Sequence, residues 1–231
     1  MEDCESRLRK LNAEFEEFAY IVSHDLKAPV RAVHNLAGWL DEDLAGNLPG
    51  DSEENFRLLK NRVSRLDKMI GALLDYSRVS RSDLEIAALD IAEKVKELIP
   101  VLNAENKAII QIQGNVPAIK TYTAKLSFVL EALLQNAMVF NDKSQAQILV
   151  KLEEETENIR IAVEDNGPGV VEVNLPKIFT MFYTTLPKDT LETTGAGLAI
   201  ANKIVTFAGG RIFAENTESG FRVTVIWPKV V

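Results

Sequence analysis

A histidine on the polar side of a predicted helix is the first residue of this chain that could do chemistry. His24 lies in the run Ser23-His24-Asp25-Leu26, and helical spacing places it about 160–200° around the helix from the apolar Val22 and Leu26. We therefore expect the imidazole to face water. Such a ring titrates near neutrality and carries a lone pair when it is unprotonated, so it could accept an incoming group. A surface histidine without a function fits the same spacing.

A carboxylate followed by two glycines is the second candidate. The run Glu164-Asp165-Asn166-Gly167-Pro168-Gly169 directly follows a predicted strand, so Asp165 projects from the end of that strand. Gly167 and Gly169 allow the backbone to turn tightly and to approach a ligand. A carboxylate at this position can accept a hydrogen bond from an exocyclic amine such as that of adenine. Asn-Gly and Pro-Gly pairs also form ordinary turns, so the run alone leaves both interpretations open.

Two further segments could bind phosphate and a metal ion. The small residues of the run Thr193-Thr194-Gly195-Ala196-Gly197-Leu198 precede a predicted helix, whose free N–H groups and positive end suit phosphate. They could equally be a simple helix cap. Asn136 lies on a predicted helix over 124–139, and its amide oxygen could ligate a hard cation. A buried asparagine with satisfied hydrogen bonds fits that position as well.

Composition narrows the class of protein. The 231 residues are 46% hydrophobic, which is enough for one or two buried cores, and we expect two domains. A net charge of -8 without a basic segment argues against a nucleic-acid partner. The single Cys4 forms no internal disulfide, and no apolar run approaches the length of a membrane span. We therefore expect a cytoplasmic protein, or the cytoplasmic part of a longer one, without membrane contact within this chain.

The elements that must position His24 are two long helices within residues 1–80. The first is expected to run to about Leu44, and Asp51 with Glu54 offers a capping box for the second. Apolar residues recur at steps of three and four along both helices: Phe15, Phe18, Val22, Leu26, Val33, Leu36 and Leu40, then Phe56, Leu59, Val63, Leu66, Ile70 and Leu73. An antiparallel hairpin cannot bury both seams alone, so we expect a dimer that forms a four-helix bundle. Packing of the hairpin on the second domain is the alternative.

Residues 85–231 are predicted to form a domain that contains both strands and helices. Strands are expected over 108–113, 148–152, 159–163, 211–214 and 221–227, and helices over 91–102, 124–139 and 197–207. Strands and helices that do not alternate strictly favour an α/β sandwich with helices on one face of a mixed sheet. The stretch 78–90 is the expected hinge between the two domains.

The order of these motifs resembles the catalytic core of a sensor histidine kinase. His24, Asn136, Asp165-x-Gly167-x-Gly169, Ile178-Phe179-Thr180-Met181-Phe182-Tyr183 and Gly195-x-Gly197-Leu198 follow one another as they do in that family. By this likeness, residues 1–80 would be a coiled-coil linker with the dimerisation and histidine-phosphotransfer hairpin, and 85–231 the ATP-binding domain that gyrase, Hsp90 and MutL share. The Asp-Leu-Lys-Ala-Pro run after His24 is similar to that of phytochrome-like kinases.

The resemblance also implies a reaction and a role for each residue. His24 would be autophosphorylated by ATP and would pass the phosphoryl group to an aspartate of a response regulator receiver domain, within a homodimer. Asp25 would act as the base beside it, Asn136 would ligate Mg²⁺, Asp165 would bind the adenine amine and Phe140 would stack on the ring. The nucleotide pocket would be shaped by Gly167, Gly169, Gly195, Gly197 and Leu198, with Lys177 as a cation and 179–194 as a lid.

Several residues depart from the family pattern and keep two other functions open. Ala132 and Val139 replace an asparagine and a basic residue around Asn136, Thr193 and Ala196 alter the glycine loop, and Ala28 replaces the polar residue four positions after His24. A pseudokinase that acts as a dimeric docking scaffold is the main alternative. An ATP-driven conformational machine of the gyrase or Hsp90 type is the third hypothesis, against which the helical hairpin argues.

Overall fold

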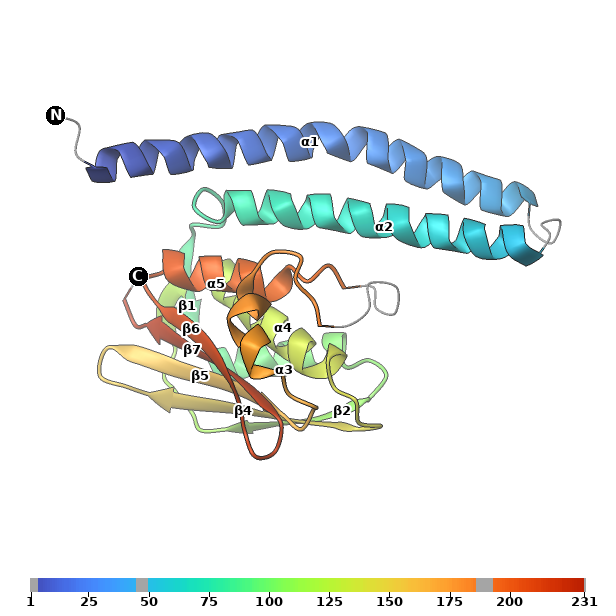
Figure 1. Ribbon diagram of the computed structural model, residues 1–231. Coiled ribbons are helices and arrows are strands. Elements are labelled where there is room, and N and C mark those ends of the chain that lie inside the picture. The colour runs from blue at the N-terminus through green and yellow to red at the C-terminus, as the bar shows by residue number, and fades with distance from the viewer. Residues whose placement is uncertain (1–3, 45–49, 186–192, 231) are drawn as a thin grey trace. The chain divides into compact units, whose positions relative to one another are not determined.

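A computed structural model describes residues 4–44, 50–185 and 193–230, and the chain divides into two units between Arg78 and Val79 (Figure 1). The first unit contains the helices α1 (Cys4–Leu44) and α2 (Gly50–Arg78), which lie antiparallel and in contact along their lengths. The predicted helical hairpin is therefore confirmed. Helix α1 continues through Pro29 and is bowed rather than straight.

On α1, the hairpin buries small side chains and leaves most of the large apolar ones exposed. Ala19, Ser23 and Ala37 of α1 are buried. In contrast, most of the predicted α1 seam is exposed: the fractions are 63% for Phe15, 53% for Leu36, and similar for Phe18, Leu26, Val33 and Leu40. About half or more of the surface of these side chains is therefore uncovered, and they form an apolar stripe on α1 in the described part of the chain.

Helix α2 begins at Gly50, one residue before Asp51. The Glu54 carboxylate accepts hydrogen bonds from Nε and Nη2 of Arg57, at 2.9 and 2.7 Å. The two side chains lie on the same face of the helix because they are three residues apart. The capping box of Asp51 with Glu54 stays a prediction, because residues 45–49 lie outside the described part of the chain.

The second unit is a five-stranded mixed sheet with helices on one face (Figure 1). The strand order is β2-β4-β5-β7-β6, in which β2–β4 is parallel and the other pairs are antiparallel. The bounds are β2 (Ala108–Gln113), β4 (Ala146–Glu154), β5 (Asn158–Asp165), β6 (Arg211–Asn216) and β7 (Phe221–Pro228), and the helices are α3 (Ile91–Leu102), α4 (Thr123–Val139) and α5 (Gly197–Phe207). The predicted α/β domain with a mixed sheet is confirmed.

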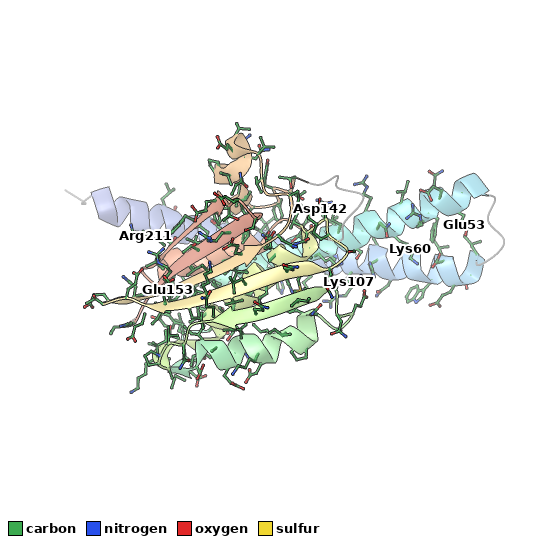
Figure 2. The ribbon with its side chains drawn as sticks, turned by 90° about the horizontal axis from the view of Figure 1, so that it is seen from below. Glu53, Lys60, Lys107, Asp142, Glu153 and Arg211 are labelled. Atoms are coloured by element: carbon green, nitrogen blue, oxygen red, sulfur yellow. The ribbon has the colours of Figure 1, made fainter. Side chains whose placement is uncertain are left out.

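The core of this unit lies between the sheet and the helices. The fully buried Trp227 of β7 donates its indole N–H to Oγ1 of Thr121 at 2.9 Å, while Leu130 and Val150 are without exposed surface. The other face of the sheet carries many charged side chains, and Figure 2 shows this face with Glu153 of β4 and Arg211 of β6 labelled. The amphipathic strands thus fix which face of the domain receives α4 and α5.

The sequence did not predict two of the strands and one helix. Strands β1 (Ile86–Leu89) and β3 (Ile119–Tyr122) form a separate antiparallel pair, and each has four residues, which is too short for a clear alternation. A 3-10 helix, η1 (Glu172–Phe179), follows the glycine-containing turn.

A buried lysine attaches the segment after α2 to the second unit. Lys125 of α4 is buried, and its ammonium donates to the carbonyl oxygens of Val79 and, at 2.8 Å, Ser82. The ammonium also lies 5.0 Å from the ring centroid of Phe207, within the range of a cation–π interaction. Together with the β1–β3 pair, these contacts fix much of the stretch 78–90 in which the sequence suggests a hinge.

Candidate active site

His24 is exposed on α1, as the helical spacing predicts. Its side chain is 66% exposed, and Nδ1 lies 3.2 Å from Oδ1 of Asp25, which is itself exposed. The other histidine, His34, is exposed on the same helix. The hydrogen-bond partner at Nδ1 distinguishes His24, because it assigns a role to each ring nitrogen.

The contact with Asp25 favours one neutral tautomer. When Nδ1–H donates to the carboxylate, the lone pair of the ring is on Nε2, which points away from the partner. A carboxylate in this position also stabilises the positive charge that develops on an imidazole as Nε2 attacks an electrophile. The pair can therefore act as a nitrogen nucleophile with a built-in orienting group.

Asp165 lies at the end of β5, in the middle of the sheet. Its neighbours in register are Ile148 of β4 and Phe221 of β7, and it is only 8% exposed. The backbone N–H of Gly167 donates to Oδ1 at 2.7 Å. Burial raises the pKa of Asp165 to about 6, opposed by the Gly167 hydrogen bond and supported by the nearby charge of Glu164. A buried carboxylate with one oxygen occupied can accept a ligand hydrogen bond at the other.

Glu164, one residue earlier, has the opposite environment. Arg222 of β7 donates to its Oε2 from Nε at 3.1 Å and Nη2 at 2.7 Å, and the Ser219 hydroxyl donates to Oε1 at 2.8 Å. Burial acts to raise the pKa of Glu164, but these hydrogen bonds and the charges of Arg222 and Lys151 lower it to about 2. Glu164 therefore joins β5 to β7 at the point where Asp165 emerges. Sequence reasoning assigned no role to this residue.

The turn after β5 needs glycines because other atoms lie close to their Cα atoms, leaving little room for a side chain. A Cβ atom on Gly167 would lie 2.7 Å from Oδ1 of Asp165 and 3.4 Å from the carbonyl oxygen of Phe140, so the turn packs on the end of α4. Gly169 has a φ of +71°, a conformation that side chains rarely adopt. Gly220, between β6 and β7, would place a Cβ 2.1 Å from the carbonyl oxygen of Asp165.

Asn141 and Asn216, to which the sequence analysis assigned no role, form hydrogen bonds with the same turn. Oδ1 of Asn166 accepts from Nδ2 of Asn141 at 3.0 Å and from the backbone N–H of Gln147 at 2.9 Å. Asn216 forms two hydrogen bonds with the backbone of Val170, at 2.8 and 2.7 Å. Asn166 stands beside Gly167 and fits an ordinary turn, whereas Asn141 and Asn216 lie far from it in the sequence, so nothing local signals these contacts.

Helices α4 and α5 bring the remaining predicted residues together. Asn136 is half-buried in the last turns of α4, and the half-buried Phe140 is its C-cap. A Cβ on Gly197, the first residue of α5, would lie 3.8 Å from Cβ of Ala132, one turn before Asn136. The small side chain at 132 thus lets the start of α5 approach α4.

The glycine loop before α5 is shaped by its backbone. Gly195 has a φ of +70°, and a Cβ there would lie 2.4 Å from the carbonyl oxygen of Tyr183. Leu198 is buried, whereas Lys177 is exposed on η1, which packs beside α5. Residues 186–192 of the predicted lid, Lys188 included, lie outside the described residues.

The described residues contain no cluster of three or more His, Cys, Asp or Glu side chains that could hold a metal by themselves. One amide oxygen, from Asn136, is the predicted metal ligand. Mg²⁺ usually keeps several waters and takes one or two protein ligands together with phosphate oxygens. The donor set therefore fits a magnesium ion that is bound with a nucleotide better than a permanent metal centre.

Comparisons with known families match both units. Residues 16–82 match the model of the His Kinase A phospho-acceptor domain, and residues 121–231 match that of the histidine kinase-, DNA gyrase B- and HSP90-like ATPase. The chain is 33% identical over 215 residues to cyanobacterial phytochrome B of Nostoc sp., an alignment that covers 91% of this chain and 29% of that protein. The chain thus spans less than a third of the length of this relative.

Solved structures share the fold. Full-length ShkA in complex with AMPPNP has a TM-score of 0.68 at 21% identity, covering 93% of this chain and 46% of that one. Histidine kinase ThkA in complex with the response regulator protein TrrA has a TM-score of 0.66 at 22% identity, covering 98% and 66%. In the described part of the chain, no helix is both long and apolar enough to cross a membrane.

Proposed function

Because the chain belongs to the histidine kinase family, with a phospho-acceptor domain and an ATPase domain, we propose that it transfers the γ-phosphoryl group of ATP to His24 and then to an aspartate of a response regulator. The observation that carries this proposal is the exposed imidazole whose Nδ1 is paired with Asp25. A nucleophile must be reachable, and its reacting nitrogen must keep a lone pair. The exposure of His24 and its contact with Asp25 support both requirements.

The transfer is a displacement at phosphorus. Nε2 of His24 attacks the γ-phosphorus, the bond from that phosphorus to the bridging oxygen breaks, and ADP leaves with the electron pair. Nε2 carries no proton in the favoured tautomer, so none has to be removed from it before attack. Asp25 holds the Nδ1 proton and balances the positive charge that develops on the ring. Positioning and charge stabilisation supply most of the catalysis in such reactions.

The second unit would hold the nucleotide. Asp165 would accept a hydrogen bond from the adenine amine with the carboxylate oxygen that Gly167 leaves available. Phe140 would stack on the ring, and Gly195 with Gly197 would present backbone N–H groups at the start of α5 to the phosphates. Leu198 would line the pocket, and Lys177 is the candidate for a phosphate cation.

Asn136 would ligate Mg²⁺ together with phosphate oxygens, and the bound ion would supply charge neutralisation. No second protein ligand is required for this role. The altered neighbours Ala132 and Val139 remove two polar groups from the same helix face. We expect this to weaken nucleotide binding rather than to abolish it.

The first unit would dimerise through the apolar stripe on α1 to give a four-helix bundle. The response regulator would then dock on the bundle near His24; histidine kinase ThkA, whose fold the chain shares, is itself solved in complex with the response regulator protein TrrA. For the nucleotide to reach His24, we propose a joint just ahead of Val79, because Lys125 holds the segment that follows. The use of ATP makes the cytoplasm the expected compartment.

Labelling with ATP tests the proposal. Wild type, His24→Gln and the matched control His34→Gln are incubated with γ-labelled ATP and Mg²⁺, and the bound phosphate is tested for acid lability and base stability. We expect an acid-labile label in the wild type and in His34→Gln, and its complete loss in His24→Gln. An unlabelled wild-type dimer would favour the docking scaffold. ATP hydrolysis that persists without His24 and without any label would favour the ATP-driven machine.

A further inference from the structure

A tyrosine lies beside the acceptor histidine on α1. The ring centroids of Tyr20 and His24 are 6.1 Å apart with planes inclined by 30°, as expected for aromatic residues four positions apart on one helix face. This separation is within the range in which aromatic pairs attract each other. The imidazole therefore has a neighbour on each of two sides, the Tyr20 ring and the Asp25 carboxylate.

The Tyr20 ring is itself held from the second helix. The guanidinium carbon of Arg78, the last residue of α2, lies 4.9 Å from the ring centroid, within the distance of a cation–π interaction. Arg78 is thus linked to the acceptor through a single side chain. All three residues belong to the first unit.

We propose that Tyr20 and Arg78 are positioning residues for phosphorylation of His24. Arg78 holds the Tyr20 ring, and the ring restricts the imidazole to the orientation in which Nδ1 faces Asp25 and Nε2 faces solvent. An exposed histidine on a helix otherwise samples several rotamers, most of which separate Nδ1 from Asp25. The inference rests on the proposed role of His24 as the phosphoryl acceptor.

The charge of Arg78 has a second consequence. An incoming phosphoryl group is anionic, and a guanidinium near the acceptor attracts it. The pairing with Tyr20 keeps this charge beside the ring that neighbours His24, and within the described residues no carboxylate forms an ion pair with Arg78. Removing the charge of Arg78 and removing the ring of Tyr20 can therefore be tested separately. Each change should slow the phosphorylation of His24.

Phosphoramidate tests the inference without ATP. It transfers its phosphoryl group directly to an imidazole nitrogen: the N–P bond to the ring forms, the P–N bond of the reagent breaks, and the nitrogen leaves as ammonia. Tyr20→Leu is expected to lower the rate of His24 labelling about threefold to tenfold, the effect of losing one aromatic pair. Tyr20→Phe should keep the rate, and so should the matched control Trp39→Leu, which removes an exposed aromatic ring from the same helix.

The two arginine variants probe the charge in the same assay. Arg78→Gln should slow labelling, whereas Arg78→Lys should restore most of the rate, because an ammonium also binds an aromatic face. Arg57→Gln, which removes an arginine near the start of α2, should have no effect. Imidazole ¹⁵N shifts should show more of the Nε2–H tautomer in Tyr20→Leu than in the wild type, at a helix content that circular dichroism shows to be unchanged.

The inference is overturned if Tyr20→Leu is labelled at the wild-type rate with the wild-type tautomer ratio. It is also overturned if Tyr20→Phe is as slow as Tyr20→Leu, because the ring is then not the active feature. The failure of the proposed function looks different. In that case the wild type takes no label from ATP, while phosphoramidate labelling of His24 still depends on Tyr20 and Arg78.

Discussion

Lowering the pH from 7 to 5 is expected to weaken the binding of adenosine by the second unit about tenfold, through protonation of Asp165. The carboxylate has to be ionised to accept the adenine amine well, and burial raises its pKa to about 6. A protonated Asp165 would present an O–H donor to an amine that also donates. Adenosine is the appropriate probe because it carries no phosphate that titrates in this range.

The magnitude follows from the pKa of the free protein. If adenosine binds only the ionised form, the apparent dissociation constant rises by a factor of one plus the ratio of protonated to ionised Asp165. With a pKa of about 6, this factor is roughly 1.1 at pH 7 and roughly 11 at pH 5. Binding should therefore be coupled to the release of a proton near pH 6.

Isothermal titration calorimetry at several pH values, in buffers of different ionisation enthalpy, measures both the affinity and the proton release. Asp165→Asn should bind more weakly at pH 7 and should lose the pH dependence between 5 and 7. Glu153→Gln, an exposed carboxylate at the other end of the same strand pair, is the matched control and should behave as the wild type. A tenfold pH effect that survives in Asp165→Asn would refute the assignment of the adenine contact to Asp165.

The raised pKa of Asp165 also predicts how the free energy of unfolding depends on pH. Its folded pKa is raised from 3.8 to about 6, so its contribution is fully present below pH 3.8 and is lost as the pH rises through 6. Asparagine cannot ionise, so the free energy of unfolding of Asp165→Asn should not fall as the pH rises through 6. At pH 7 this variant should be more stable than the wild type by up to about 3 kcal/mol. Chemical denaturation of the ligand-free protein at pH 4 and pH 7 measures the effect. Equal stability differences at both pH values would contradict it.

Three further predictions test the supports of the site. Gly220→Ala should impair nucleotide binding and lower the free energy of unfolding by about 1–3 kcal/mol, because its Cβ collides with the Asp165 carbonyl; calorimetry and denaturation measure both. Lys125→Met should accelerate hydrogen exchange in the segment after α2, because two carbonyls lose their donor, whereas the exposed Lys120→Met should not. Leu36→Glu should convert a dimer to monomers in analytical ultracentrifugation, unlike Asn35→Glu; a persistent dimer would exclude this stripe as the interface.

Helical spacing was sufficient to predict the exposure of His24 and the hairpin that carries it. The angle between a side chain and its neighbours on a helix depends only on their separation along the chain, so the prediction needed no tertiary contact. The same spacing identified the apolar seam on α1 but not its surroundings. Small residues such as Ala19 and Ala37 allow α2 to pack closely, and the large side chains of the seam are left outside the hairpin.

The sequence proposed residues for the candidate nucleotide site but gave no indication of their pKa values. The run around Asp165 signalled a turn after a strand, which is local information. Its raised pKa depends on burial in the middle of the sheet, and its neighbour Glu164 is held by an arginine 58 positions away. Two adjacent carboxylates thus differ strongly in pKa although their local sequence gives no reason for it.

The sequence by itself determined which side chains face water on α1, where the main strands and helices lie, and the order of the motifs that mark the family. Only the tertiary structure decided which charges are buried, which glycines meet another backbone and how the segment after α2 is anchored. The physical reason is that periodicity fixes the direction of a side chain relative to its own element. Burial, pKa and close contact depend on what another element places against it, and for Lys125 and Gly220 those elements are far away in the sequence.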